Sequence, residues 1–227
     1  MSRIVKSPEE RRAEFIAAAN KLFLSKGYAG TSVNDLITEV GVSKGAFYHH
    51  FDSKQAVLAA WSDNMLDQYR HMLGGLVVDP NISALDKWQQ MLRHSNQWKL
   101  DQRDIMLSYT KIINMDENIQ LKHYVMQRTS KLLADYYQII IKQGNSEGVF
   151  VVPVPEMTAQ LMVSVLFSFS ETLTQQLLNH GIETLTVEDV IPSVKATQQA
   201  IERMLGAEEG TMPLIDDELL QAWFMAE

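Results

Sequence analysis

Helix-start and helix-stop residues alternate along almost the whole chain, and they limit the fold more than any other feature of the sequence. Ser7-Pro8-Glu9-Glu10 combines an N-cap serine, a proline suited to the first helical position and a glutamate placed to complete a capping box. Apolar residues then recur at helical spacing as far as Gly27, which is expected to end the helix. Similar signals repeat downstream with few strand patterns between them, so the sequence predicts an all-α fold.

Four helices are predicted in the first third of the chain. The first three are followed by a longer fourth helix over 54–73. The apolar residues of each helix recur on one face, as in helices that pack against a core. The first helix is predicted to start at Ser7 and end at Gly27, and the second to start at Thr31 or Ser32 and end at Gly41. The third is predicted to start at Ser43 and end at about His50 or Phe51, and the fourth to start at Ser53 and end at Gly74-Gly75.

The rest of the chain is also predicted to be helical. Phe150-Val151-Val152 is a short strand-like run, but Pro153 and Pro155 favour an extended linker there. Gly144 is expected to end the helix before this linker. The predicted ranges are 83–99, 102–114, 117–143, 156–179 and 187–205, with a last short helix after Asp216-Asp217.

The composition excludes several classes of protein. The chain has no cysteine, which excludes a disulfide scaffold, a zinc site with thiolate ligands and a cysteine nucleophile. The start, MSRIVKSPEERR, lacks the apolar core of a signal peptide, and the most apolar run, 161–169, is less than half of a membrane span. We therefore expect a soluble, cytoplasmic protein.

Charge is distributed unevenly along the sequence. Residues 1–54 contain 8 Lys and Arg against 6 Asp and Glu, a net charge of +2, whereas residues 55–227 contain 12 against 22, a net charge of −10. Such asymmetry suggests that the N-terminal part faces a polyanion while the remainder keeps the molecule soluble. Chance variation in surface charge is the alternative.

The segment GVSKGAFYHHFDSK, residues 41–54, has the pattern of a helix-turn-helix, in which the second helix enters the major groove of DNA. Gly41 suits the sharp turn because glycine readily adopts a positive φ. The following helix starts with small residues that allow close approach to DNA, and Phe47 and Phe51, four residues apart, are expected to face inward. A packed hairpin within an all-helical domain is the alternative.

Residues 27–58 resemble the DNA-binding signature of the TetR/AcrR family of transcriptional regulators. The resemblance is specific over roughly the first 70 residues, and beyond them it is limited to size and helical character. It implies an all-α homodimer, usually a repressor, that a small ligand releases from its operator. The matching residues are Gly27-Tyr28, Thr31-Ser32-Val33, Gly41-Val42-Ser43-Lys44-Gly45, Tyr48-His49, Phe51 and Ser53-Lys54.

The resemblance also assigns roles to individual residues. Lysine can donate to guanine O6 and N7, so Lys44 is the best candidate for a specific base contact. Whether His49 or His50 faces the groove stays open, and Ala46 offers only a methyl group where a hydroxyl is common. Base reading is implied for Lys44, Gly45, Ala46 and His49, and phosphate binding for Thr31, Ser32, Tyr48, His50 and Lys54. Ser43, the expected N-cap of the recognition helix, is also predicted to be a DNA-binding residue. Arg3, Lys6, Arg11 and Arg12 would add positive charge nearby.

The resemblance divides the chain into a DNA-binding domain, 1–53, and a ligand-binding and dimerisation domain, 54–227, in which 54–73 is the connecting helix. The helices near 156–179 and 187–205 are the predicted dimer pair, although the first could instead be a core helix of one subunit. Adaptable apolar side chains are the candidate lining of an effector pocket, with ordinary core packing as the alternative for each. They are Trp88, Met91, Leu92, Trp98, Met106, Tyr109, Ile112, Ile113, Met126 and Met162.

Catalysis has little support in the sequence. The chain lacks the G-x-S-x-G, H-E-x-x-H, P-loop and dinucleotide-binding patterns, and its remaining histidines have no metal-like spacing. We therefore predict no catalytic residue, no metal site and no cofactor. The partners predicted are double-stranded DNA, a small apolar or aromatic effector and a second copy of the chain. A helical-body enzyme or a protein-interaction adaptor carrying a helix-turn-helix is the alternative.

Overall fold

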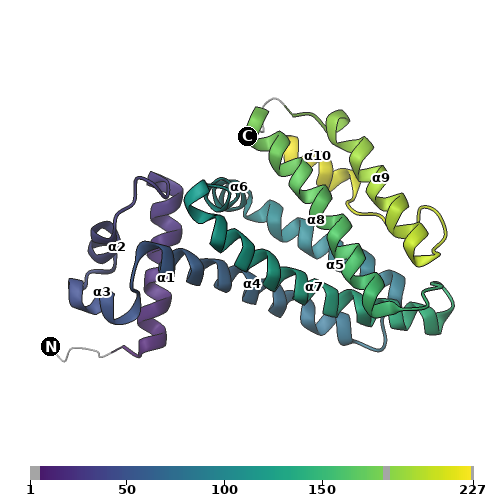
Figure 1. Ribbon diagram of the computed structural model, residues 1–227, viewed down its shortest axis with the longest axis horizontal. Coiled ribbons are helices and arrows are strands. Elements are labelled where there is room, and N and C mark those ends of the chain that lie inside the picture. Colours follow the sequence, from purple (N-terminus) through teal and green to yellow (C-terminus); the bar gives the residue numbers. More distant parts are fainter. Residues whose placement is uncertain (1–5, 181–184, 226–227) are drawn as a thin grey trace. The chain divides into compact units, whose positions relative to one another are not determined.

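The computed structural model describes residues 6–180 and 185–225, and this part of the chain is helical with no strand (Figure 1). The all-α prediction is therefore confirmed. The elements are α1 (Pro8–Lys26), α2 (Val33–Val40), α3 (Lys44–His50), α4 (Lys54–Val78), α5 (Ala84–Asp101), α6 (Arg103–Ile113), the short 3-10 helix η1 (Asp116–Asn118), α7 (Ile119–Glu147), α8 (Pro155–His180), α9 (Val187–Leu205) and α10 (Asp217–Met225).

The predicted capping box starts α1. The backbone N–H of Glu10 donates to Ser7 Oγ at 3.1 Å, and the Glu10 carboxylate accepts from the backbone N–H of Ser7 at 2.6 Å. These bonds satisfy amide groups that have no partner within the helix, so a local sequence signal determines where the chain becomes helical.

The sequence predicts that one helix ends at Gly74-Gly75 and another at Gly144. Both predictions are wrong, because these glycines lie inside helices. α4 continues through Gly74-Gly75 to Val78, and α7 continues through Gly144 to Glu147. At Gly144 the reason for glycine is packing, because a Cβ there would lie 2.0 Å from Cδ2 of Phe150. At Gly74 a Cβ would meet the Tyr136 hydroxyl at 3.4 Å, an ordinary contact, so packing does not require glycine at that position.

The chain forms two compact units. The first, which we call the head unit, contains residues up to Gln68 together with Asp104–Val125; the second, the body unit, contains Tyr69–Arg103 and the residues from Met126 onward. The head unit therefore includes a segment that lies outside the predicted domain 1–53. That functional division stays a prediction, because it describes roles rather than compactness.

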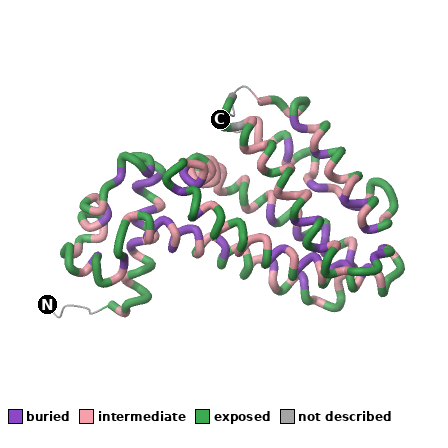
Figure 2. Tube along the Cα trace, in the orientation of Figure 1, coloured by how far each residue is buried: buried purple, intermediate pink, exposed green. Residues whose placement is uncertain are grey.

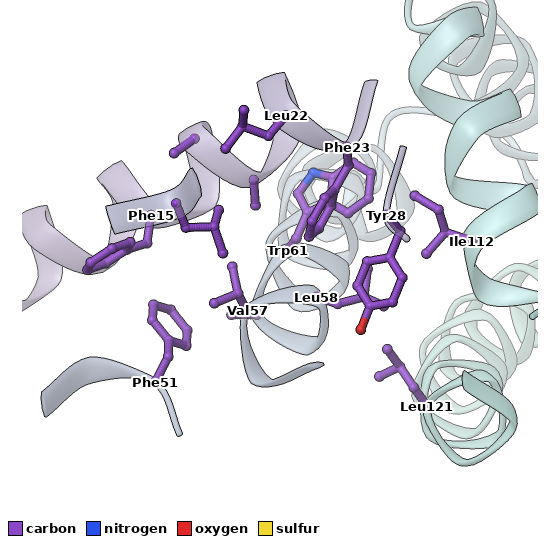
Figure 3. Packing of buried hydrophobic residues seen from close by; sticks show 14 of the residues in the cluster. Phe15, Leu22, Phe23, Tyr28, Phe51, Val57, Leu58, Trp61, Ile112 and Leu121 are labelled. Carbon is purple, nitrogen blue, oxygen red and sulfur yellow. The ribbon is translucent and has the colours of Figure 1, made fainter. Parts of the chain in front are cut away.

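The core of the head unit is rich in aromatic side chains (Figure 3). Phe15 and Phe23 of α1, Trp61 of α4 and the returning residues Ile112 and Leu121 are all buried in one cluster. Phe23 and Trp61 pack edge to face with ring centroids 5.6 Å apart, a favoured geometry for aromatic pairs. The segment 104–125 is thus part of the support on which α1 to α3 rest.

The body unit is built on helix pairs. α8 packs on α9, and α10 packs on both α5 and α9. The chain between α9 and α10 is held by a buried carboxylate, because Glu202 Oε1 accepts from the backbone N–H groups of Gly210 at 2.9 Å and Met212 at 3.1 Å. Figure 2 shows buried segments on α5 and on the C-terminal half of α7, where these helices pack. Among the described helices, none is long and apolar enough to cross a membrane.

Candidate nucleic-acid interface

The turn between α2 and α3 has the geometry that a helix-turn-helix requires. Gly41 has φ 71° and ψ 41°, in the left-handed region, and its N–H reaches the carbonyl oxygens of Ile37 and Thr38. Ser43 then caps α3 by accepting from the N–H of Ala46 at 3.2 Å. An L-residue with a side chain is strained at a positive φ, so glycine allows the chain to reverse here within two residues.

Two phenylalanines fix α3 against α1. Phe47 and Phe51 are buried, and their ring centroids lie 5.3 Å and 5.7 Å from that of Phe15, both edge to face. The prediction that Phe47 and Phe51 face inward is confirmed. A helix of seven residues is unstable alone, so these contacts are what hold α3 in place.

Burying Phe47 turns the opposite face of α3 outward. Lys44, Gly45, Tyr48 and His49 are exposed, with 47% of the Tyr48 surface accessible. The Lys44 ammonium lies 5.9 Å from the centroid of the Tyr48 ring, at the outer limit of a cation–π contact. α3 therefore presents a cation, a phenol and an imidazole together on one surface.

The two adjacent histidines differ in environment. His49 is exposed, whereas His50 is half-buried with its ring centroid 6.2 Å from that of Phe15. Burial lowers the pKa of His50 first, and the positive charges of His49, Arg11 and Arg12 lower it further. His49 is therefore the more accessible of the two side chains, and which of them reads a base stays a prediction.

Thr31 lies inside the head unit. Its residue surface is 1% accessible, and its hydroxyl donates to the carbonyl oxygens of Gly27 at 2.8 Å and Leu22 at 3.3 Å. The prediction that the Thr31 side chain binds phosphate is therefore corrected: the hydroxyl satisfies carbonyl groups at the end of α1. Ser32 beside it is exposed and forms a capping box with Asp35.

Lys54 has an intramolecular partner that the sequence did not predict. Its ammonium donates to the carbonyl oxygen of Tyr28 at 2.7 Å and lies 4.0 Å above the Tyr28 ring. The side chain is half-buried and connects the start of α4 to the turn after α1. A phosphate contact by Lys54 would have to use the remaining donors of the ammonium group.

Sequence reasoning missed a structural role for Arg12. Its guanidinium lies 4.5 Å above the Phe51 ring, and Nη1 donates to the carbonyl oxygen of His50 at 3.4 Å. Arg12 thus holds the C-terminal end of α3 from a position on α1. No local signal pairs residues 38 positions apart, although a cation near an aromatic helix end is a recurrent arrangement.

The remaining charges of the N-terminal arm are partly neutralised. Lys6 and Arg11 both form ion pairs with Glu14. These pairs lower the pKa of the Glu14 carboxyl, chiefly through the hydrogen bond from Lys6. Arg3 lies outside the described residues. Among the described residues of the arm, Arg12 differs from Lys6 and Arg11 in that it contacts the Phe51 ring and the carbonyl oxygen of His50 rather than a carboxylate.

The ten candidate pocket residues do not form one group. Four belong to the head unit, where Ile112 and Ile113 are buried in the core and Tyr109 donates to Ser62 Oγ at 3.1 Å. For these two isoleucines, packing between the elements of the head unit overrides the predicted role. Met106 is the fourth.

The other six candidates belong to the body unit. Trp88, Met91 and Met162 are fully packed, and Trp88 Nε1 donates to the carbonyl oxygen of Pro213 at 3.2 Å. The accessible members of the set are Leu92, Trp98 and Met126. Within the described residues, no group of His, Cys, Asp and Glu side chains could hold a metal ion.

Comparison with known proteins identifies the helix-turn-helix segment of the head unit. Residues 15–61 match the model described as "Bacterial regulatory proteins, tetR family". Over 142 residues the chain is 45% identical to the uncharacterized HTH-type transcriptional regulator YerO of Bacillus subtilis (strain 168), covering 60% of this chain and 48% of that protein. Over 80 residues it is 34% identical to the HTH-type transcriptional repressor KstR2 of Rhodococcus jostii (strain RHA1), covering 33% and 39%. The chain thus spans less than half the length of these relatives in each alignment.

A solved structure extends the likeness in fold to both units. The crystal structure of a regulator assigned to the tetR family, from Mesorhizobium loti, superposes with a TM-score of 0.64 at 20% identity, covering 88% of this chain and 98% of that one. At this identity the match shows the fold alone. With the turn at Gly41 and the outward face of α3, the match over residues 15–61 shows that these residues form the helix-turn-helix segment of the tetR family of bacterial regulatory proteins.

Proposed function

We propose that this protein is a homodimeric repressor that binds a palindromic operator and is released from it by a small effector bound in the body unit. The observation that carries this proposal is the division of α3 into two faces. Phe47 is buried against Phe15, so Lys44, Tyr48 and His49 are held on a rigid outward surface. A short helix anchored in this way can enter the major groove of DNA.

The exposed residues divide by the chemistry that they can supply. Lys44 and His49 can donate to base edges, and Gly45 allows the backbone to approach them closely. Tyr48 and Ser32 carry hydroxyls suited to phosphate oxygens. Ala46 contributes only a methyl group, so DNA shape would supply part of the specificity. We leave Thr31 out of this interface because its hydroxyl is buried.

The N-terminal part of the chain, with a net charge of +2, would face the duplex, while the net charge of −10 belongs to the remaining residues. Repulsion between that negative charge and DNA is screened over roughly 8 Å at physiological salt. Favourable contacts by a few cations on and beside α3 would then be enough for salt-dependent binding. A regulator of this kind would act in the cytoplasm, beside the chromosome.

The proposed dimer surface lies on α8 and α9. Met157 and Leu161 of α8 are 54% and 57% exposed, and the exposed Ser164 and Ser168 continue the same stripe at spacings of three and four residues. Large apolar side chains beside small ones suit close packing against another helix. Binding of a dimer to a palindromic operator requires two α3 helices about 34–36 Å apart, the spacing of successive major grooves.

Repression and release are the finer parts of the proposal. KstR2 is named a repressor, and its similarity to this chain lies in a segment of 80 residues. In the body unit, Leu92 and Trp98 of α5 retain accessible surface that an apolar or aromatic compound could cover. An effector that binds the released conformation more tightly would lower operator affinity by the ratio of its two affinities.

The test is binding to DNA fragments that flank the protein's own gene, over a salt series, for the wild type, Tyr48→Ala and Tyr48→Phe. We expect selective, salt-dependent binding to a palindrome by the wild type. Tyr48→Ala should weaken binding to all sequences, whereas Tyr48→Phe separates the loss of the hydroxyl from that of the ring. Absence of selective binding at any salt concentration would contradict the proposed function.

A further inference from the structure

Two lysines of α1 form matched ion pairs with α2 in the head unit. Lys21 Nζ lies 2.6 Å from Glu39 Oε1, and Lys26 Nζ lies 2.7 Å from Asp35 Oδ1. Both lysine side chains remain open to solvent, with exposed fractions of 67% and 50%. The pairs differ in place, because Asp35 belongs to the first turn of α2 and Glu39 to the last. The two lysines therefore differ mainly in which end of α2 they reach.

Asp35 connects Lys26 to the residue that caps the start of α2. Its Oδ1 accepts from the Lys26 ammonium, while its Oδ2 accepts from the backbone N–H of Ser32 at 2.8 Å and from the Ser32 hydroxyl at 2.6 Å. The hydrogen bond from Lys26, followed by those from Ser32, lowers the pKa of Asp35, so this carboxylate is charged at neutral pH. The Lys26 ammonium and Ser32 are thus bound to the two oxygens of one carboxylate at the start of α2.

The turn between α1 and α2 keeps Lys26 at this position. Lys26 is the last residue of α1, and the chain passes back so closely that a Cβ at Gly30 would lie 2.4 Å from the Lys26 carbonyl oxygen. Glycine, which has no Cβ, allows this approach. One residue later, the buried Thr31 hydroxyl donates to the carbonyl oxygen of Gly27 at 2.8 Å. A tight turn therefore fixes the base of the Lys26 side chain beside the start of α2.

Hydrogen-bond donors at this end of α2 are unequally available. The Ser32 hydroxyl has one proton, and it donates that proton to Asp35. The Lys26 ammonium has three, and its bond to Asp35 uses one of them. The Asp35 carboxylate would also repel a phosphate, and the positive charge of Lys26 offsets this repulsion. Lys26 can therefore supply both a donor and a compensating charge to an anion that approaches here.

We propose that Lys26 binds a phosphate of the DNA backbone at the start of α2, beside Ser32. This inference rests on the proposed function, in which Ser32 faces the duplex. The first helix of a helix-turn-helix crosses the DNA backbone, so a cation at its start meets phosphate rather than base edges. Lys26 thus adds affinity without sequence preference. Lys21 lacks this role, since Glu39 holds its ammonium at the opposite end of α2.

The two lysines provide a matched experiment. Lys26→Met and the control Lys21→Met each remove one exposed cation of α1 and one ion pair with α2, whereas Lys26→Arg retains the charge. Binding to the DNA fragment that the wild type selects, and to an unrelated fragment, is titrated at several salt concentrations. Denaturant unfolding measures the stability of each variant, and Lys26→Gln replaces Lys26→Met if the latter does not fold.

We expect Lys26→Met to weaken binding to both fragments by roughly three- to tenfold, as for the loss of one hydrogen bond. The slope of log K against log salt should become shallower by about 1 for each subunit bound. Lys26→Arg should retain most of the affinity, and Lys21→Met should bind as the wild type does. Equal losses for Lys26→Met and Lys21→Met, a loss confined to the selected fragment, or an unchanged salt slope would overturn the assignment.

The same titrations separate this inference from the proposed function. If the wild type binds DNA selectively and Lys26→Met binds it equally well with the same salt slope, the Lys26 assignment fails and the proposed function stands. If the wild type binds no DNA selectively at any salt concentration, the proposed function fails, and the Lys26 assignment, which rests on it, fails as well.

Discussion

The ammonium of Lys54 lies 4.0 Å above the ring of Tyr28 and donates a hydrogen bond of 2.7 Å to the carbonyl oxygen of the same residue. One residue at the start of α4 is thus bound twice to the turn that joins α1 to α2. Because Tyr28 is itself buried against Phe23, with ring centroids 5.2 Å apart, this contact extends from the surface into the core of the head unit. Lys54 is therefore a structural residue whatever it does with DNA.

Lys54→Met should lower the free energy of unfolding by about 1–3 kcal/mol, since it removes a charge-assisted hydrogen bond and a cation–π contact but keeps the length of the side chain. Denaturant unfolding measures the loss. Lys54→Arg retains the charge and is the matched comparison. If Lys54→Met weakens DNA binding without any change in stability, Lys54 acts through phosphate instead.

Lys44→Ala should relax the preference for one base pair in each half-site, with a loss of about 1–3 kcal/mol on the preferred sequence. The reason is that the exposed Lys44 ammonium projects from the first turn of α3, where base edges are reached. Competition between operators that differ at single positions measures this preference. A uniform loss over all sequences would show that Lys44 contacts only the backbone.

Arg12→Met should weaken operator binding several-fold with little change in its dependence on salt. Arg12 positions the end of α3 through Phe51 and the carbonyl group of His50, so its loss should misplace the helix rather than remove a phosphate contact. Binding titrations at several salt concentrations give the slope of log K against log salt. A slope that falls by about 1 would assign Arg12 to phosphate binding instead.

Thr31→Val should cost about 1–3 kcal/mol of folding stability, because the buried carbonyl group of Leu22 and the partly buried one of Gly27 lose their hydroxyl donor while the shape of the side chain is kept. Thr31→Ser keeps the hydroxyl and should therefore lower the folding stability by less than Thr31→Val. Thermal or denaturant unfolding compares the two variants. A Thr31→Val protein of wild-type stability that binds DNA poorly would restore Thr31 to the interface.

Gly144→Ala and Gly75→Ala should have opposite effects, although both glycines lie inside helices. A methyl group at Gly144 would overlap the Phe150 ring, whereas nothing lies within 4 Å of a Cβ at Gly75. We expect Gly144→Ala to destabilise by at least about 1–3 kcal/mol and Gly75→Ala to stabilise by up to about 1 kcal/mol. Denaturant unfolding curves measure the free energy of unfolding of both variants. A Gly144→Ala protein as stable as the wild type would mean that the Phe150 ring can move away at little energetic cost.

Local sequence signals predicted the fold well wherever a structural effect depends on neighbouring residues. The capping box at Ser7 and the left-handed turn at Gly41 are determined by residues within four positions, and both lie where they were predicted. The burial of Phe47 also follows from helical spacing alone.

The errors arise where the partner is distant in the sequence. Gly144 looks like a helix end until the position of the Phe150 ring is known. Ile112 fits the pattern of a pocket residue as well as that of a core residue, and only the structure shows that it is buried in the head unit. Thr31 fits a family pattern that cannot distinguish an exposed hydroxyl from a buried one. Hydrophobic periodicity shows that a side chain faces inward but not which interior it joins.

The contribution of residues 104–125 to the head unit has a consequence for engineering. Ile112, Ile113 and Leu121 complete an aromatic core that the first 68 residues only partly enclose, and the buried Asn118 is bonded to the carbonyl group of Ile112. A chimera that transfers only the helix-turn-helix to another regulator would leave these residues behind and expose Trp61 and Tyr28 to water. Exchange of DNA specificity between two such proteins should therefore be made by substitutions on the outer face of α3, or by moving both stretches of chain together.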